Sequence, residues 1–328
     1  MLLSIIVPCF NEEDVLPIFI QEIDRIAKQM AAEKGISFEF LFINDGSSDG
    51  TLELLRTKSR GDSRIRYISF SRNFGKESAI YAGLCNANGD YTAVMDADMQ
   101  DPPSLLPEML RLLEAGEYDC VATRRSDRTG EPIIRSYFAR CFYKLINKIS
   151  DADIIDGARD FRLMKRGMVD AIVSMKEYNR FSKGIFGWVG FRTYWLSYDN
   201  VERAAGVTKW NFWKLFKYAI DGIINFSEAP LRIASWMGMI FTGVSILSLL
   251  FIVLRRLIFG DPVAGWASTI CVIIFSGGSQ LLSMGIMGQY IAKAYSEVKQ
   301  RPHYIVSEES QKQIEAEQVE VDYTRVQK

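Results

Sequence analysis

The sequence contains a single histidine, His303, in 328 residues. His303 follows a long apolar region near the end of the chain, where we expect a solvated surface position. Catalysis therefore cannot depend on a histidine base, and a metal site built from several histidines is excluded. Cysteine is also scarce: the five cysteines are odd in number, scattered, and without a Cys-x-x-Cys pair. This pattern indicates a reduced soluble part that faces the cytosol.

The chain has no surplus of charge of either sign. Its 39 lysines and arginines nearly balance 40 aspartates and glutamates, which gives a formal net charge of -1. A protein that binds duplex nucleic acid needs a basic face to displace counterions. No nucleic-acid partner is therefore expected.

Apolar residues are distributed unevenly along the chain. The stretch from Ile233 to Leu254 has no charged residue and would be roughly 33 Å long as a helix, enough to cross a bilayer. A second uncharged stretch runs from Val263 to Ala292. The pattern predicts two transmembrane helices, at 233–254 and 263–292, that form a hairpin in the lipid bilayer. A buried helical hairpin of a soluble protein is the alternative.

Basic residues near the two predicted spans indicate their orientation. Lys293, Lys299 and Arg301 follow the second span, which favours a cytoplasmic front domain and a cytoplasmic tail at 293–328, although Arg255-Arg256 opposes this. We therefore expect a multi-pass plasma-membrane protein, with a disordered end to its tail. Small residues in the second span would allow close helix packing and a homo-oligomer: Gly277, Gly278, Ser279, Gly285 and Gly288.

Two segments before the hairpin are amphipathic and basic. One lies near 133–149, within a front domain that we assign to residues 1–208, and the other lies at 209–229. Such helices can lie in the headgroup layer, with aromatic rings at the interface and cations toward anionic lipid. A helix that packs on the core and keeps a solvated basic side is the alternative for each.

The first 125 residues alternate short β-branched or aromatic runs with helical stretches, which predicts an α/β fold with a mainly parallel sheet covered by helices on both faces. We expect Asn11 to cap the first helix and Gly35 to lie near its end. Ligands of such sheets bind beyond the carboxyl ends of the strands. The expected strands are Leu3–Val7, Phe38–Ile43, Ile65–Ser69, Tyr91–Met95 and Cys120–Ala122.

An acidic pair, Asp96 and Asp98, directly follows the fourth expected strand, and Gln100 comes shortly after it. Mg²⁺ and Mn²⁺ prefer one or two carboxylates and take their other ligands from water and substrate phosphates. The pair is therefore a candidate metal site. A solvated turn before the Pro102-Pro103 helix start is the alternative.

Five short motifs stand along the chain: 7–13 (VPCFNEE), 44–51 (NDGSSDGT), 71–76 (SRNFGK), 96–103 (DADMQDPP) and 160–164 (DFRLM). They occur in the order seen in family 2 glycosyltransferases. More narrowly, the chain resembles the polyprenyl-phosphate glycosyltransferases, which include bactoprenol glucosyltransferases and the more distant dolichol-phosphate mannose synthases. This resemblance covers about residues 1–300 and implies a GT-A-like, Rossmann-type sheet.

The resemblance implies a nucleotide-sugar site. In the family pattern Pro8, Glu12 and Asp45 line the nucleoside pocket, and the turn after Asp45 lets the base approach closely. Arg72 and Lys76 match residues that meet phosphate or sugar oxygens. A surface salt bridge is the alternative for Lys76.

The same pattern implies roles for the acidic residues. Asp98 and Gln100 would hold a divalent metal, Mg²⁺ or Mn²⁺, and Asp96 would face the donor sugar or ribose. Asp160 matches the proposed catalytic base. A phosphate monoester is mostly ionised at pH 7, so Asp160 can instead orient the acceptor or the sugar. The residue before it is Arg159, where many relatives have glycine, and Asp156 is a second carboxylate close by.

Basic residues match the family's phosphate-binding positions. Arg124 and Arg135 would bind the acceptor phosphate, which suits the planar fork of arginine. Arg203 and Lys209 match a loop that closes over the diphosphate. Both residues can alternatively be juxtamembrane cations attracted to anionic lipid.

The implied reaction is an inverting transfer of a hexose from a UDP-sugar donor to a polyprenyl phosphate, in one in-line displacement. UDP-glucose is the first expectation for the donor, with GlcNAc, galactose and mannose as alternatives. A processive polysaccharide synthase would carry a Gln-x-x-Arg-Trp motif and further spans, which this sequence lacks. A non-catalytic membrane scaffold would be expected to have lost its acidic residues, and these are retained.

Overall fold

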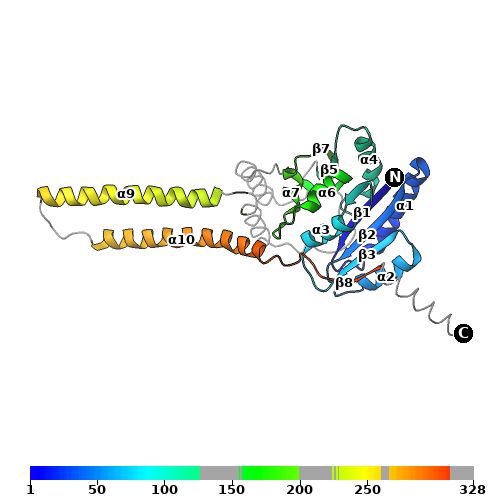
Figure 1. The fold of residues 1–328 in the computed structure, drawn as a ribbon, viewed down its shortest axis with the longest axis horizontal. Helices are drawn as coiled ribbons and strands as arrows, with labels where there is room; N and C mark the ends of the chain where they lie inside the picture. The colour runs from blue at the N-terminus through cyan, green and yellow to red at the C-terminus, as the bar shows by residue number, and fades with distance from the viewer. Residues whose placement is uncertain are drawn as a thin grey trace.

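The protein was analysed as a computed structural model that describes residues 1–125, 155, 157–198, 224, 227, 229–259 and 266–310. Its soluble part is built on a sheet of eight strands in the order β7-β5-β6-β4-β1-β2-β3-β8 (Figure 1). The predicted α/β class is therefore confirmed, and all five expected strands are present. They are β1 (Leu2–Cys9), β2 (Ser37–Asn44), β3 (Ile65–Phe70), β4 (Tyr91–Val94) and β5 (Cys120–Arg125).

The sheet is mixed, with four parallel and three antiparallel strand pairings. Strands β1 to β4 are parallel to one another, as expected for strands joined by helical crossovers. Three further strands were not predicted: β6 (Ala158–Lys165), β7 (Thr193–Tyr198) and β8 (Val306–Glu309). Strand β6 runs antiparallel between β4 and β5, whereas β7 is parallel to β5 at one edge of the sheet.

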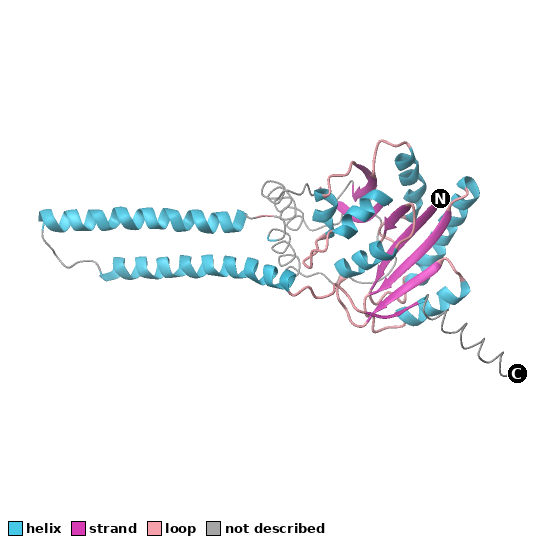
Figure 2. Ribbon diagram, viewed as in Figure 1, coloured by secondary structure: helices cyan, strands magenta, loops and turns pink. Residues whose placement is uncertain are grey.

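Helices cover both faces of the sheet (Figure 2). Because side chains alternate along a strand, Ile5 and Val7 face one core and Ile6 faces the other. The first core packs against α1 (Leu16–Lys34), α2 (Thr51–Gly61) and α4 (Leu106–Glu114), which follows the short helix η1 (Pro103–Leu105). The second packs against α3 (Lys76–Asn86), α6 (Arg166–Ser174) and α7 (Ser182–Trp188).

Close contact between α3 and the sheet depends on Gly83. A Cβ atom at this position would lie 2.1 Å from the side chain of Ile6, so only glycine lets the helix approach β1 this closely. Helix α3 is therefore packed directly on β1, and this contact fixes the position of its N-terminus.

The first helix begins differently from the expectation. Gly35 ends α1 in the left-handed conformation, as predicted, but Val15 is the residue at its N-cap, so the capping role assigned to Asn11 is wrong. Asn11 itself has a positive φ of 55°. Its side chain is used elsewhere, because its Oδ1 accepts the backbone N–H of Ser48 at 2.9 Å.

The chain returns to the sheet after its apolar helices. Strand β8 pairs antiparallel with β3, within the segment expected to be a tail. Glu308 accepts two bonds from the Arg56 guanidinium, at 2.9 and 2.6 Å, and one from the Tyr67 hydroxyl at 3.0 Å. Residues 306–309 of that segment therefore belong to the sheet, and residues beyond Ser310 lie outside the described part.

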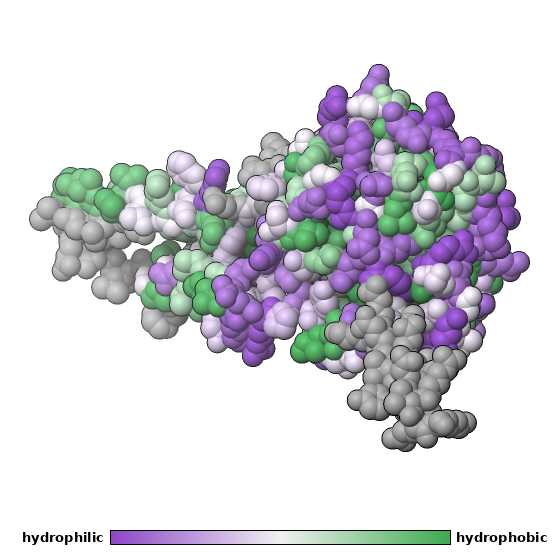
Figure 3. Space-filling model, turned by 45° about the vertical axis from the view of Figure 1, so that its right-hand side comes forward, coloured by the Kyte–Doolittle hydropathy of each residue, from purple (hydrophilic) through white to green (hydrophobic). Residues whose placement is uncertain are grey.

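Two long helices, α9 (Ala229–Phe259) and α10 (Trp266–Val298), project from the soluble part side by side (Figure 1). The rings of Phe241 and Phe275 contact each other edge to face at 5.2 Å. Large apolar side chains on both helices are exposed, as Figure 3 shows for one face. By length and composition, the segment Ala229–Ser248 could cross a membrane. The second span, at 263–292, stays a prediction.

We expect Glu308→Gln to lower the free energy of unfolding by about 1–2 kcal/mol, because Arg56 and Tyr67 lose a charged acceptor. Chemical denaturation of the detergent-solubilised protein measures this value. The matched control is Glu53→Gln, which removes the exposed partner of the same Arg56 and should cost less than about 0.5 kcal/mol. Equal losses in the two variants would contradict the role given to β8.

Candidate active site

The predicted site residues gather at one edge of the sheet. Strands β1 to β4 are parallel, so the polar residues that follow them lie at their carboxyl ends, where open sheets bind ligands. Asp160 reaches the same edge by another route. In the antiparallel pair, Val94 of β4 lies opposite Arg162 of β6, so Asp160 falls beside the residues that follow β4.

The loops after β1 and β2 fasten each other. Ser47 Oγ accepts the backbone N–H of Asn11 at 3.0 Å, and Thr51 Oγ1 accepts that of Glu12 at 2.9 Å. Gly46 has a φ of 64°, and a Cβ atom there would lie 2.4 Å from the backbone of Arg72. The close approach at this glycine is thus made to the loop after β3.

Asp45 connects the loop after β2 to the start of α3. Its buried carboxylate accepts the backbone N–H of Phe74 at 2.7 Å and that of Gly75 at 2.9 Å. Burial raises the pKa of Asp45 above its usual value, although the two N–H groups and Arg72 act in the opposite direction. The carboxylate therefore orders the loops of the site from within.

Lys76 lies between two of the predicted acidic residues. Its ammonium group is 2.7 Å from Asp96 Oδ1 and 2.5 Å from Asp160 Oδ2. The Lys76 side chain is 44% exposed, whereas that of Asp160 is 17% exposed, so the pair faces solvent mainly through the lysine. The alternative of a salt bridge for Lys76 is therefore present in the structure. Its partners are two predicted site residues, so this salt bridge lies inside the candidate site.

The ion pair decides the charge state of Asp160. Burial alone would raise the pKa of this carboxyl, but Lys76, Lys183 and Arg162 together hold it well below its usual value. In the same way Asp160 and Asp96 raise the pKa of Lys76 against the effect of desolvation. Asp160 is therefore an anion throughout the neutral range and a weak proton acceptor.

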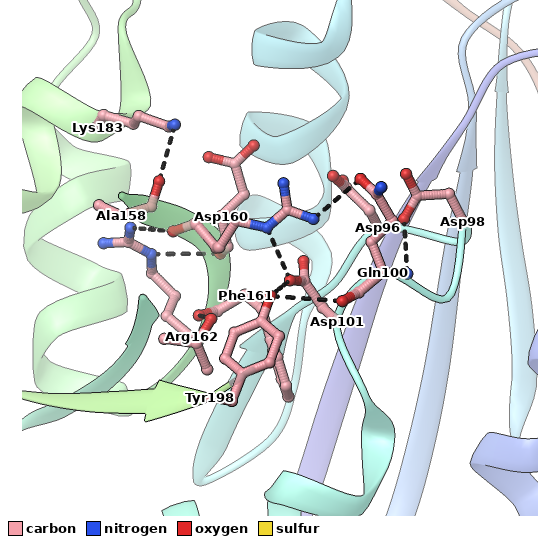
Figure 4. Close-up of polar contacts among 12 residues, drawn as sticks. Asp96, Asp98, Gln100, Asp101, Ala158, Asp160, Phe161, Arg162, Lys183 and Tyr198 are labelled. Atoms are coloured by element: carbon pink, nitrogen blue, oxygen red, sulfur yellow. Dashed lines mark hydrogen bonds and ion pairs between the residues drawn. The ribbon is translucent and has the colours of Figure 1, made fainter. Parts of the chain in front are cut away.

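Asp98 and Gln100 belong to a single turn after β4. Asp98 Oδ1 accepts a hydrogen bond from the backbone N–H of Gln100 at 3.1 Å, and Gln100 Oε1 accepts one from Arg159 Nη2–H at 3.2 Å. Figure 4 shows the carboxylates of Asp96, Asp98 and Asp160 directed to the same side of this turn. Carboxylate and amide oxygens suit a hard cation whose remaining ligands come from water and a diphosphate. No cluster of three His, Cys, Asp or Glu side chains that could hold a metal occurs in the part of the chain that the structure describes.

A buried carboxylate, Asp101, holds this turn against the sheet. Asp101 Oδ1 accepts a hydrogen bond from Arg159 Nε–H at 2.9 Å and a second one from the hydroxyl group of Tyr198 in β7. The side chain of Asp101 is fully buried, and its Oδ2 has no hydrogen-bond partner among the described residues. Burial raises the pKa of Asp101 despite the neighbouring Arg159. The network ties the metal-binding candidate to β6 and β7 (Figure 4).

Asp160 is also supported from below. The guanidinium of the buried Arg162 lies 3.5 Å from the ring centroid of Phe186 in α7, and its Nε–H points to the Asp160 carbonyl at 3.4 Å. Glu77, next to Lys76, accepts the backbone N–H of Ser182 at 2.8 Å and also its hydroxyl proton. Burial raises the pKa of Glu77.

The remaining predicted residues surround this centre or lie outside the described part. Pro8 and Glu12 are half-buried at the end of β1. Arg72 is exposed, with its guanidinium 4.0 Å from the Phe74 ring centroid. Arg124 is exposed at the end of β5 and donates to Ser197 Oγ at 2.9 Å. Positions outside the described residues are Arg135, Arg203, Lys209, Asp156 and the amphipathic segment near 133–149.

Several residues of the site were not identified from the sequence. Asp101, Tyr198 and Glu77 gave no separate signal, because each becomes buried only through partners distant in the chain. Arg159 carried a weak signal, since many relatives have glycine at its position. That difference now has a physical account: the Arg159 guanidinium bonds both Asp101 and Gln100.

We expect Asp101→Ala to lower the free energy of unfolding by about 3 kcal/mol or more, because it leaves the half-buried Arg159 without its counter-ion. Tyr198→Phe keeps that ion pair and should cost about 1 kcal/mol. Denaturant unfolding of the two variants, with Asp101→Ala/Arg159→Met as a third, measures the difference. If the double variant is no more stable than Asp101→Ala, the loss of stability does not come from an unpaired Arg159, and the explanation is wrong.

The model of glycosyl transferase family 2 matches residues 4–173. The bactoprenol glucosyl transferase of Shigella phage SfV is 40% identical over 312 residues, which cover 95% of this chain and 100% of that protein. The prophage bactoprenol glucosyl transferase homolog of Escherichia coli strain K12 is 41% identical over 306 residues, which cover 93% of this chain and 98% of that protein.

Among solved structures, glucosyl-3-phosphoglycerate synthase from Mycobacterium tuberculosis, in complex with Mn²⁺, UDP-glucose and phosphoglyceric acid, is 17% identical with a TM-score of 0.44. That match covers 68% of this chain and 77% of that one. The family model covers more than half of the chain, and the relatives align along nearly all of it. The chain therefore belongs to glycosyl transferase family 2 and is a glycosyltransferase.

Proposed function

We propose that the chain transfers glucose from UDP-glucose to a membrane polyprenyl phosphate, with inversion at the anomeric carbon. The observation that carries this proposal is the match to the bactoprenol glucosyl transferase of Shigella phage SfV, because it covers the whole of that protein. The match therefore includes the apolar helices as well as the catalytic sheet, and the acceptor named for that protein is a lipid.

The geometry at the sheet edge supports a donor site. Three loops that follow β1, β2 and β3 are fastened together around Asp45, which leaves a polar edge for a nucleoside. Pro8, Glu12 and Asp45 would line it. Asp98 and Gln100 would hold Mg²⁺ or Mn²⁺, and a metal bound there neutralises the charge of a departing diphosphate. Asp96, held by Lys76, would face the donor sugar.

Asp160 fits an orienting role better than that of a strong base. Its carboxylate is ionised and paired with Lys76, whereas a lipid phosphate is already a competent nucleophile near pH 7. The phosphate oxygen would attack the anomeric carbon as UDP leaves from the opposite face. Asp160 would orient the acceptor or the sugar, and most of the rate enhancement would come from positioning and charge stabilisation.

Basic residues around the edge would bind the phosphates. Arg124, exposed at the end of β5, and Arg135 are proposed for the acceptor phosphate, and Arg72 for the donor. Arg203 and Lys209 are proposed for the diphosphate. The helices α9 and α10 would hold the catalytic domain at the cytoplasmic surface of the bilayer, where a polyprenyl phosphate presents its headgroup.

The test is a panel of radiolabelled nucleotide sugars offered to the purified full chain with undecaprenyl phosphate and Mg²⁺ or Mn²⁺. We expect the label of UDP-glucose to enter the lipid fraction and a chelator to stop the transfer. Labelling from UDP-GlcNAc or UDP-galactose alone would correct the sugar. No labelled lipid from any donor would overturn the proposal.

We expect Asp98→Asn to reduce transfer by more than about a hundredfold while the protein remains folded, because a carboxylate that would hold the metal is lost. Initial rates at saturating metal, together with the thermal unfolding midpoint, measure both properties. Asp170→Asn, which changes an exposed carboxylate on α6, is the matched control and should retain its rate. Retained activity in Asp98→Asn would remove this residue from the metal site.

We expect Lys76→Met to move the acid limb of the transfer rate to higher pH. Lys76 is the main cation that lowers the pKa of Asp160, so burial raises that pKa once the lysine is gone. Protonation of Asp160 would then reduce the rate at pH 5 about tenfold beyond the fall that the wild type shows when its acceptor phosphate takes up a proton. Lys58→Met, at an exposed position on α2, is the control, and parallel profiles for the two variants would contradict the assignment.

A further inference from the structure

The end of α10 is joined to the catalytic domain by one carboxylate. Glu297 accepts the backbone N–H of Tyr178, at 2.9 and 3.0 Å to its two oxygens, and that of Asn179 at 3.2 Å. The Asn179 side-chain amide adds a fourth bond at 3.1 Å. An ionised acceptor of several N–H groups makes stronger bonds than a neutral one. The apolar hairpin therefore meets the loop between α6 and α7 through a defined contact.

The chain beyond α10 continues this contact. The ring of His303 packs against Tyr81 of α3 at 4.7 Å between centroids and against Tyr178 at 5.8 Å. The next residue, Tyr304, stacks on Phe70 of β3 at 4.8 Å. Aromatic contacts of this kind add to the free energy gained from burial alone. The end of the hairpin is thus packed on α3 as well as on the loop.

The loop that receives Glu297 rests on α3. Arg180 lies over the ring of Tyr81 at 4.2 Å and donates to the carbonyl oxygens of Met175 and Ile172. Tyr81 also approaches the Val173 carbonyl, at 3.5 Å. Any displacement of this loop would therefore disturb its contacts with both α3 and α6.

Both α3 and the start of α7 continue into the catalytic centre. Ser182, the first residue of α7, donates twice to Glu77, and Lys76 beside Glu77 holds Asp96 and Asp160. Tyr81 and Lys76 belong to the same short helix, one at the junction with the hairpin and one in the site. A chain of contacts therefore links Glu297 to Asp160 through the 178–179 loop, α3 and Lys76.

We propose that Glu297 is a positioning residue for glycosyl transfer: its docking on the 178–179 loop sets α3 and α7 so that Lys76 holds Asp160 in place. This inference rests on the proposed function and deepens it. The apolar hairpin then does more than keep the enzyme near its lipid acceptor, because its end is part of the framework that orders the site.

Loss of a membrane tether and loss of a positioning residue would affect different steps of the reaction. If Glu297 only presented the domain to the membrane, its loss would weaken use of the lipid acceptor and leave acceptor-free hydrolysis of the donor unchanged. If it orders Lys76 and Asp160, both reactions lose rate together. The comparison of transfer with hydrolysis therefore separates the two.

The experiment uses the full chain in vesicles that contain undecaprenyl phosphate, with Glu297→Ala, Glu297→Gln and the matched control Lys299→Ala, an exposed residue two positions along. In Glu297→Ala we expect kcat for transfer and the rate of UDP-glucose hydrolysis without acceptor to fall together, by about tenfold. The KM for the lipid and the membrane-bound fraction should not change. Glu297→Gln, which keeps one acceptor oxygen, should lie between the wild type and Glu297→Ala, and Lys299→Ala should match the wild type.

Hydrogen exchange provides a readout that does not depend on activity. In Glu297→Ala we expect faster exchange at 76–82 and 158–162 as well as at 175–182. Faster exchange confined to 175–182, or a loss of transfer through the lipid KM alone, overturns the inference. An inactive wild type would overturn the proposed function, and the exchange pattern would still decide the role of Glu297.

Discussion

The ion pairs of Lys76 are the interaction on which the rest of the site depends. A single ammonium group bonds carboxylates from the loop after β4 and from β6, so it joins a parallel strand to an antiparallel one at the edge where ligands bind. Two buried charged groups nearby, Asp101 and Arg162, and the half-buried Glu77 would be costly without partners, and each has one. The arrangement keeps several like charges close together in a partly desolvated space, which is typical of a site that binds a charged substrate.

Much of the fold could be predicted from local patterns. Strands β1 to β5 are runs of β-branched or aromatic residues that both faces of the sheet bury, and such runs are legible in a single sequence. Strand β6 was missed because its sequence, ARDFRLMK, places three cations among its apolar residues. The burial of Arg162 depends on Phe186, which lies in another element. Strand β8 is a short polar edge strand, and its pairing with β3 spans most of the chain.

The candidate site divides in the same way. Asp96, Asp98 and Gln100 follow a recognisable strand, and Asp160 was found through an ordered family motif, so their common edge could be anticipated. The network of Asp101, Arg159 and Tyr198 could not, because the residues are separated by 58 and 97 positions and no local pattern records their contact. Asn11 shows the opposite error. Asparagine is favoured at helix N-caps, but the Asn11 side chain accepts a hydrogen bond from Ser48, which is distant in the sequence, and does not cap α1.

The position of β8 after both long helices has a consequence for how the enzyme is made. Strand β3 leaves the ribosome early, but the strand that covers its edge emerges only after the whole hairpin has been synthesised. At roughly 5–20 residues per second, that edge stays open for on the order of ten seconds or more. An unpaired edge is a template for pairing with other chains. Completion of the sheet is thus delayed until both apolar helices have been synthesised, and a chain that stops before β8 would leave the edge of β3 exposed.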